Sequence, residues 1–219
     1  HLPKFRDDLY WTQDGNCLNA TSEMMLGNYH RNEILDGASL PLKYYAYSTC
    51  FRREAGSYRK EERGMIRGHQ FNKIEMFNFT TEDKSWEAFD EMVGYVEKLT
   101  EGLGLHHQTS LLAAGDASAA MAKTVDIEVW IPSMNIYKEV SSASNALDYQ
   151  ARRGNIRYKP NSTGSGQASE GNKFVHTLNA SGLATSRLIP AILEQFQQED
   201  GSVLVPEVLQ KFMGKKILK

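Results

Sequence analysis

The sequence has few cysteines and no long apolar run, and each absence narrows the kinds of protein it can encode. Its two cysteines, Cys17 and Cys50, match neither a disulfide framework nor a paired zinc-ligand spacing. We therefore expect two free thiols in a reducing cytoplasm and no structural zinc. No segment approaches the roughly 18 consecutive apolar residues of a membrane-spanning helix. The first residues, HLPKFRDDLYW, also lack the basic and then apolar pattern of a signal peptide.

The sequence also lacks an excess of positive charge and a phosphate-binding glycine loop. Its formal net charge is -2, so no global positive field exists to hold RNA, and any contact with nucleic acid must be local. Without a G-x-x-x-x-G-K loop, arginines and aromatic side chains would have to hold a bound nucleotide. The chain starts without an initiator methionine, and we expect an N-terminal part to be missing.

The hydrophobic pattern predicts one domain that combines an antiparallel sheet with a few helices. A chain of 219 residues with 41% hydrophobic content can bury one substantial core, so residues 1–219 are expected to form a single catalytic domain. The period of apolar residues over 84–103 predicts an amphipathic helix. Its apolar face comprises Trp86, Phe89, Met92, Val93, Val96, Leu99 and Leu103.

Short segments rich in β-branched and aromatic residues indicate strands. They are YYAYSTCFRRE, FNKIEMFNF, TVDIEVWIP and YKEVSSAS. Because no regular crossover helices separate them, the fold class is expected to be α+β with an antiparallel sheet of six or more strands. Residues 161–173 are mostly small and polar, which predicts a flexible surface loop. A second helix is expected over 183–198, in which Pro190 should introduce a kink or mark the true start.

The densest group of charges lies at residues 51–75, with five arginines, two lysines, four glutamates and one histidine. Such a run is often only a solvated face. Here strand-like segments flank it on both sides, so some of the charges must point from a sheet into a cavity. Arginines held on a sheet can offer a planar fork to phosphate oxygens, and Phe71 can stack on a base.

Several stretches of the chain resemble one enzyme family. FRREAGS followed by RGMIRGHQFNKIE looks like motif 2 of class II aminoacyl-tRNA synthetases in the seryl form, and HTLNASGLATSR at 176–187 looks like motif 3. LNATSE at 18–23 and YKEVSSASNALDYQARRGNIRY at 137–158 agree with this family, as do HLPKF and QQEDGSVLVPEVL. The similarity covers nearly the whole chain in collinear order, which makes it far more specific than any single motif.

The resemblance implies a class II antiparallel sheet and an enzyme that activates serine with ATP and Mg²⁺. Arg52 would grip the α-phosphate and the serine carboxylate, and Glu54 would place the adenine end of ATP. Arg67 would reach the far phosphates. Histidine is a common catalytic base, but in this motif His69 would fix the hairpin instead. The catalytic residues that the resemblance implies are Arg52 and Arg187.

The remaining ATP ligands come from the second half of the chain. Phe71 and Arg187 would sandwich the adenine through stacking and cation–π attraction. Glu139 and Ser142 would bind magnesium, which prefers hard oxygen ligands supplemented by phosphates.

The same resemblance implies a serine pocket between LNATSE and the strand that contains Glu75. Thr21 and Glu23 would lie near the serine ammonium group, and Glu75 would accept a hydrogen bond from the serine hydroxyl, assisted by Asn179 or Ser181. A pocket that binds a hydroxyl rejects alanine because its own polar groups would be left unpaired.

Two parts of the family are not found in the sequence: motif 1, which builds the class II dimer interface, and the coiled-coil arm that grips tRNA(Ser). We expect the intact protein to be a homodimer. Two alternatives stay open: a synthetase-like enzyme that activates an amino acid for a non-tRNA acceptor, and a non-catalytic paralogue. For Glu75 alone, the simpler interpretation is a carboxylate that only pairs with Arg67 or Lys73.

Overall fold

The computed structural model describes residues 6–54, 64–160 and 171–219. Its centre is a six-stranded sheet with the order β2-β3-β9-β6-β5-β4, in which every neighbouring pair is antiparallel. The strands are β2 (Leu42–Phe51), β3 (Gln70–Thr80), β4 (His107–Leu111), β5 (Lys123–Ile131), β6 (Ile136–Asn145) and β9 (His176–Ala184). The α+β fold class and the antiparallel six-stranded sheet are therefore confirmed.

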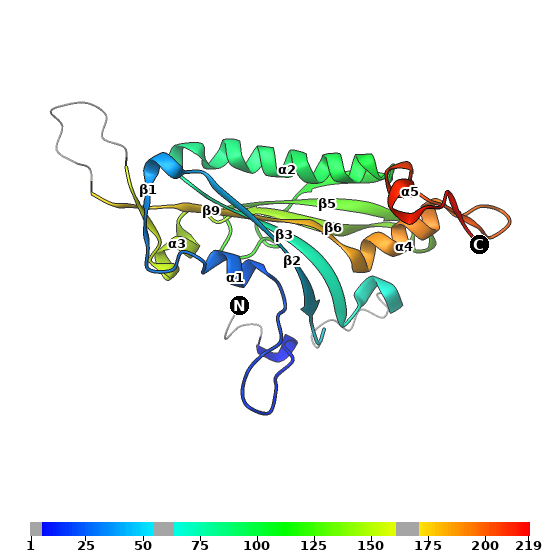
Figure 1. The fold of residues 1–219 in the computed structure, drawn as a ribbon, viewed down its shortest axis with the longest axis horizontal. Coiled ribbons are helices and arrows are strands. Elements are labelled where there is room, and N and C mark those ends of the chain that lie inside the picture. Colours follow the sequence, from blue (N-terminus) through cyan, green and yellow to red (C-terminus); the bar gives the residue numbers. More distant parts are fainter. Residues whose placement is uncertain (1–5, 55–63, 161–170) are drawn as a thin grey trace.

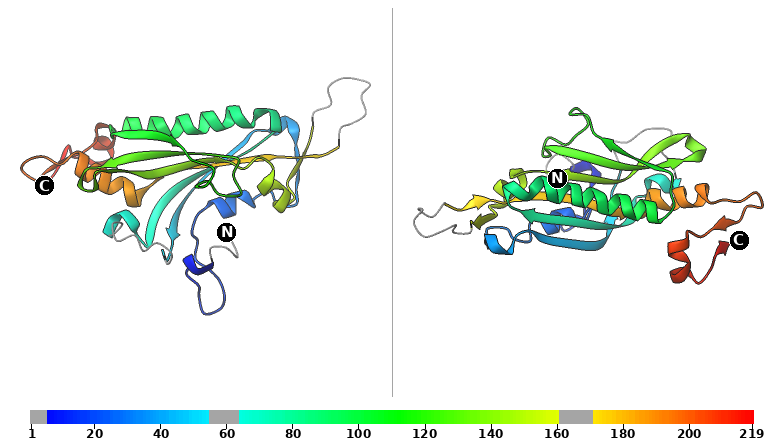
Figure 2. Two further views of the ribbon diagram at one scale, coloured as in Figure 1. Left: turned by 180° about the vertical axis from the view of Figure 1, so that it is seen from behind. Right: turned by 90° about the horizontal axis from the view of Figure 1, so that it is seen from above.

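The helices cover both faces of this sheet. The long helix α2 (Ser85–Gly102) lies along one face, and α1 (Glu23–Gly27) and α3 (Tyr149–Gly154) lie on the other (Figure 1). Helix α4 (Thr185–Gln195) follows β9 directly and packs against β5, β6 and β3. The view from above shows α2 running over the strands (Figure 2). The active-site candidates lie on the face that α2 leaves uncovered.

Smaller elements complete the described chain. A three-stranded sheet joins β1 (Ile34–Asp36), β7 (Arg157–Lys159) and β8 (Lys173–Phe174), and β10 (Val203–Leu204) pairs with β11 (Ile217–Leu218) around α5 (Glu207–Met213). The short 3-10 turns are Arg6–Asp8, Gly37–Ser39, Gly64–Arg67, Glu82–Lys84 and Pro132–Met134. None of the helices in the described part of the chain is long and apolar enough to cross a membrane.

Two apolar clusters stabilise the layers. One unites α2 with the central strands and α4, and it includes Phe89, Val96, Ile127 and Leu178. The other lies between the sheet, α3 and the small sheet, and its largest fully buried side chains are Phe77 and Phe79. Burying a side chain of this size stabilises the fold by about 1.5–3 kcal/mol. Strand β3 packs against both clusters and β9 contributes to the first, which fixes the polar side chains they carry.

The helix predicted over 84–103 is confirmed as α2, whose buried residues include Phe89, Met92 and Val96. The second predicted helix is real but shorter than residues 183–198. Pro190 lies inside α4 and does not mark its start. The predicted loop at 161–173 lies mostly outside the described residues, and Lys173 already belongs to β8.

Candidate active site

The most deeply buried part of the site is centred on Glu75 of β3, which is 1% exposed. Its Oε1 accepts a hydrogen bond from Asn179 Nδ2 at 3.2 Å, and its Oε2 accepts one from Ser181 Oγ at 3.4 Å. Lys73 Nζ forms an ion pair with Oε2 at 2.5 Å. Asn179 and Ser181 reach Glu75 because β9 runs antiparallel to β3, with Glu75 opposite Ser181. The predicted grouping of Glu75, Asn179 and Ser181 is therefore present.

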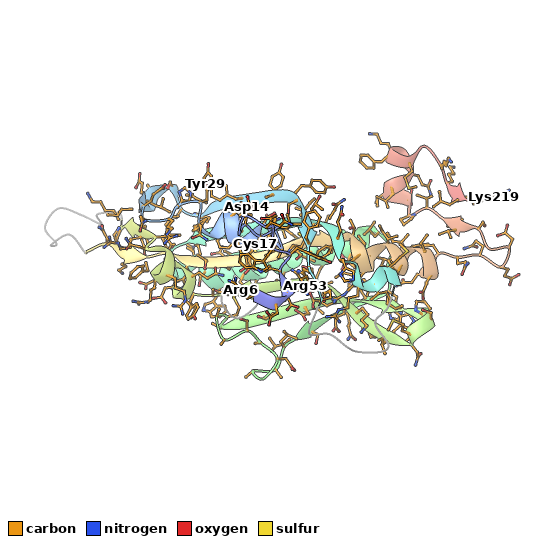
Figure 3. The ribbon with its side chains drawn as sticks, turned by 90° about the horizontal axis from the view of Figure 1, so that it is seen from below. Arg6, Asp14, Cys17, Tyr29, Arg53 and Lys219 are labelled. Atoms are coloured by element: carbon orange, nitrogen blue, oxygen red, sulfur yellow. The ribbon has the colours of Figure 1, made fainter. Side chains whose placement is uncertain are left out.

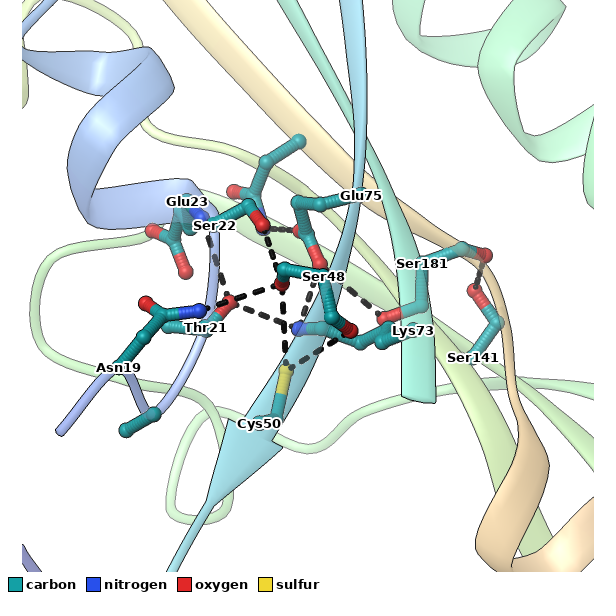
Figure 4. Close-up of polar contacts among 12 residues, drawn as sticks. Asn19, Thr21, Ser22, Glu23, Ser48, Cys50, Lys73, Glu75, Ser141 and Ser181 are labelled. Carbon is teal, nitrogen blue, oxygen red and sulfur yellow. Dashed lines mark hydrogen bonds and ion pairs between the residues drawn. The ribbon is translucent and has the colours of Figure 1, made fainter. Parts of the chain in front are cut away.

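The loop that precedes α1 forms the opposite side of this pocket (Figure 4). Thr21 is 2% exposed, and its Oγ1 accepts hydrogen bonds from Lys73 Nζ at 2.8 Å and from the Glu23 amide at 3.3 Å. Gln150 of α3 donates to Glu23 Oε1 at 3.0 Å and accepts from Thr177 Oγ1 of β9 at 2.7 Å. Lys73 thus connects Thr21 with Glu75, and Glu23 lies near enough to Glu75 for the two charges to interact.

The electrostatics of this pocket are those of two acids close to one base. Burial raises the pKa of Glu23, and the neighbouring charge of Glu75 raises it further. Lys73 and the hydrogen bond from Gln150 act in the opposite direction. Carboxylate oxygen is therefore concentrated around Glu23 and Glu75, with Lys73 offsetting part of the negative charge.

Arg52 connects this pocket with the aromatic side of the site. Its Nε donates to Ala20 O at 3.3 Å, and its guanidinium carbon lies 5.3 Å from the centre of the Phe71 ring. The Arg52 amide donates to His69 O at 2.9 Å, which holds the chain as β2 ends. The N-terminal segment holds the next residue of the chain, because the Arg53 amide donates to Asp8 O at 2.8 Å. Figure 3 labels Arg53 together with Arg6 and Cys17 of this N-terminal segment.

Two further arginines are paired with the acids predicted to share their ligand. Arg67 Nε donates to Glu54 Oε2 at 2.7 Å, and both side chains are about one-fifth exposed. Arg187 of α4 donates to the Glu139 carbonyl at 2.8 Å and lies 3.5 Å from Glu139 Oε2. The structure thus places Arg187 beside Glu139 of β6. Phe71 contacts Arg52 in the present arrangement, and the expected sandwich of Phe71 and Arg187 around adenine stays a prediction.

A cluster of acidic residues lies where β5 pairs with β6. Asp126 is opposite Ser142, and Glu128 is opposite Glu139. Asp126 is 6% exposed, and its Oδ1 has no hydrogen-bond partner among the described residues. Burial raises the pKa of Asp126 to about 6, against a hydrogen bond from Ser142. Leaving a buried carboxylate oxygen without a hydrogen bond costs free energy, and a bound ion or water is one common way in which proteins satisfy such an atom.

These residues fit a magnesium ion that also uses ligand oxygens. Glu139, Ser142 and Asp126 supply only oxygen atoms, which suits magnesium and not zinc. Within the described ranges, no three His, Cys, Asp or Glu side chains converge into a complete metal cage. Magnesium commonly takes one or two carboxylates and completes its shell with phosphates and water, so such a cage is not required.

Reasoning from the sequence gave Lys73 only as a candidate ion-pair partner of Glu75, which it is, and not as part of the site. It missed Gln150 and Asp126 altogether. Lys73 had a usable signal, because on a strand it lies two residues from both Phe71 and Glu75 and so projects to their face. Asp126 had a weaker one, as an acid within the apolar run TVDIEVWIP. Gln150 had none, since only the tertiary structure brings α3 to Glu23.

Comparison with known proteins relates this geometry to a family. Residues 10–196 match the model of the tRNA synthetase class II core domain (G, H, P, S and T). The chain is 58% identical to serine–tRNA ligase 2 of Clostridium acetobutylicum, covering 98% of this chain and 50% of that protein. It is 50% identical to serine–tRNA ligase of Petrotoga mobilis, with 99% and 50% covered. The chain thus spans about half the length of the curated relatives it matches.

Two solved structures have the same fold. The seryl-tRNA synthetase of Pyrococcus horikoshii complexed with ATP superposes with a TM-score of 0.90 at 41% identity, covering 98% of this chain and 47% of that one. The cytoplasmic serine–tRNA ligase of Naegleria fowleri in complex with AMP gives 0.89 at 40% identity, with 100% and 52% covered.

Proposed function

We propose that this chain, which belongs to the class II tRNA synthetase core-domain family, activates serine with ATP to form seryl-adenylate. The observation that carries the proposal is the buried Glu75 carboxylate, held by Asn179 and Ser181 opposite the loop that contains Thr21 and Glu23. A pocket of this kind suits a small amino acid with a hydroxyl group. The names of the relatives, serine–tRNA ligase, agree with this substrate.

Each end of serine has a complementary group in the pocket. Glu23 attracts the ammonium group, and Glu75 accepts a hydrogen bond from the side-chain hydroxyl. Arg52, which lies between the loop at Ala20 and the ring of Phe71, takes the carboxylate and the α-phosphate. Alanine cannot donate the hydroxyl hydrogen bond, so the acceptor position that the buried Glu75 carboxylate offers to the substrate stays unfilled, which costs binding free energy.

The reaction needs positioning and charge neutralisation more than proton transfer. Serine reaches the site with its carboxylate already ionised, so no general base is required for its attack on the α-phosphorus of ATP. The carboxylate oxygen forms a bond to phosphorus, and pyrophosphate leaves. Arg52 meets the charge that develops on the α-phosphate, while Arg67 binds the outgoing phosphates and Phe71 with Arg187 holds the adenine.

Magnesium would be held by Glu139 and Ser142, and when bound it supplies positive charge to the phosphates. The two structural relatives, one complexed with ATP and the other with AMP, support a nucleotide in this site. Glu54 places the adenine end. Its side chain is already fixed by Arg67 at 2.7 Å.

The names of the relatives favour tRNA(Ser) over a non-tRNA acceptor, and adenylate chemistry then transfers the seryl group to the terminal ribose of that RNA. We further propose that the enzyme acts as a homodimer in the cytoplasm, where its free thiols Cys17 and Cys50 remain reduced.

Serine-dependent exchange of pyrophosphate into ATP, measured with magnesium present, tests the activation step. We expect exchange with serine to exceed exchange with alanine by at least about tenfold. Exchange that does not depend on serine, or that alanine supports equally, would contradict the proposal. Charging of tRNA(Ser) relative to another tRNA tests the acceptor separately.

A further inference from the structure

Lys73 is a buried cation that the proposed chemistry does not use. It is 7% exposed and lies on β3 between Phe71 and Glu75, on the same face as both. Lysine is almost never fully buried unless it is paired. Here its ammonium pairs with Glu75 Oε2 at 2.5 Å and donates to Thr21 Oγ1 at 2.8 Å (Figure 4).

The two partners of Lys73 belong to opposite sides of the pocket. Glu75 is the acceptor for the amino-acid side chain, whereas Thr21 belongs to the loop whose next acid, Glu23, faces the ammonium group of the substrate. The Glu23 amide also donates to Thr21 Oγ1, at 3.3 Å. A single ammonium therefore sets the distance between the two halves of the amino-acid site.

Lys73 also balances the charge of this space. Glu23 and Glu75 are close enough for the charge of Glu75 to raise the pKa of Glu23, and Lys73 counteracts this effect. Removing one partner of a buried ion pair leaves the other charge uncompensated, which typically disrupts the site more than replacing both partners. Without Lys73, Glu75 would have to remain as an unpaired buried charge or take up a proton that blocks one acceptor oxygen.

We propose that Lys73 is a positioning residue for amino-acid selection, which holds Glu75 as an oriented hydroxyl acceptor and ties it to the Thr21 loop. The inference rests on the proposed function and deepens it. Selection of serine over alanine then depends on Lys73 through Glu75, although Lys73 need not touch the hydroxyl. A lysine that only stabilises the fold would lower both activities together and leave their ratio unchanged.

The test is the serine-to-alanine ratio of kcat/KM in pyrophosphate exchange, measured on the full chain and on Lys73→Met, Glu75→Gln and the double variant. We expect Lys73→Met to lower the ratio at least about tenfold, chiefly through KM for serine, while KM for ATP changes less than about threefold. In the Glu75→Gln background, Lys73→Met should change the ratio by less than about threefold, because residues that act through each other are not additive.

Lys43→Met is the matched control. Lys43 of the neighbouring strand β2 also pairs with a glutamate, Glu91 of α2, at 2.5 Å, but both side chains are exposed. It should leave the ratio unchanged. If Lys73→Met does not fold, the double variant removes both charges and is compared with Glu75→Gln alone. The proposal would be overturned if Lys73→Met left the serine-to-alanine ratio unchanged. It would also be overturned if Lys73→Met lowered this ratio by the same factor in the Glu75→Gln background as in the parent. A parent chain without serine-dependent exchange would instead refute the proposed function.

Discussion

The two sides of the candidate site, which we assign to the amino acid and to the nucleotide, are built differently. On the amino-acid side, Glu75, Lys73 and Thr21 are each less than one-tenth exposed and bond to one another. On the nucleotide side, Arg67 and Arg187 remain a fifth to a quarter exposed and pair with Glu54 and Glu139. The first region is held by buried contacts, whereas the second keeps its cations in partly exposed ion pairs.

The proposed function accounts for this difference. A small pocket distinguishes serine from alanine by one hydroxyl, so its polar groups must be held in place before the substrate arrives. ATP brings several negative charges of its own, and arginines at a partly solvated surface can bind them without complete desolvation. We therefore expect substitutions on the two sides to change different kinetic quantities.

The largest effect is expected at Arg52, which belongs to both sides. Arg52→Ala should lower the rate of adenylate formation by about 100-fold or more, because losing a group that meets developing charge costs about 3 kcal/mol of transition-state stabilisation. The measurement is pyrophosphate exchange at saturating serine and ATP. Arg53→Ala is the control, since Arg53 is exposed and adjacent. Equal exchange rates in Arg52→Ala and the parent would refute this role.

Glu75→Gln should affect only the amino-acid side. A hydrogen bond between a charged acceptor and a hydroxyl contributes about 1.5–3 kcal/mol, so the preference for serine over alanine should fall roughly ten- to two-hundredfold. KM for ATP should change far less. Exchange kinetics with serine, alanine and threonine measure both quantities. An unchanged serine-to-alanine ratio together with weaker ATP binding would show that Glu75 serves the nucleotide side, as a simple ion-pair partner.

Asp126, on the nucleotide side, should make the free energy of unfolding depend on pH when divalent ions are absent. The pKa of Asp126 is raised from 3.8 to about 6 in the folded protein, so between these values the folded state binds more protons than the unfolded state. Stability should thus fall as pH rises from about 4 to about 6, by roughly 2 kcal/mol. Urea unfolding of the parent and Asp126→Asn across this range measures the effect, which should be absent in the variant. A parallel pH dependence in both proteins would assign the change to other groups.

The smallest effect is expected at Glu139. Glu139→Gln keeps the size of the side chain but removes its charge, so half-maximal exchange should require about tenfold more magnesium, while KM for serine stays the same. Titration with magnesium at saturating ATP gives the first quantity. Glu128→Gln, on the neighbouring strand β5, tests whether any acid in this region would have the same effect. If both variants respond alike, the ion is attracted by the local charge and is not bound specifically by Glu139.

Local sequence signals were sufficient for part of the fold. The apolar period over 84–103 predicted α2, and the segments rich in β-branched and aromatic residues predicted β2, β3, β5 and β6. The segment HTLNASGLA gave no such signal, because asparagine, serine, alanine and glycine are poor strand formers. It nevertheless forms β9 in the middle of the sheet, where pairing with β3 and β6 decides its conformation.

The sequence by itself determined the amphipathic helix, the antiparallel fold class and, through the collinear motifs, the grouping of Glu75 with Asn179 and Ser181. These features depend on neighbours along the chain or on a resemblance that the motif residues carry. The sequence offered Lys73 as an ion-pair partner of Glu75, and the structure contains that pair. The tertiary structure alone decided that Lys73 also donates to Thr21, and that Gln150 connects Glu23 with Thr177. These partners lie far apart in the sequence, and only the packing of α1 and α3 on the sheet brings them within hydrogen-bond distance.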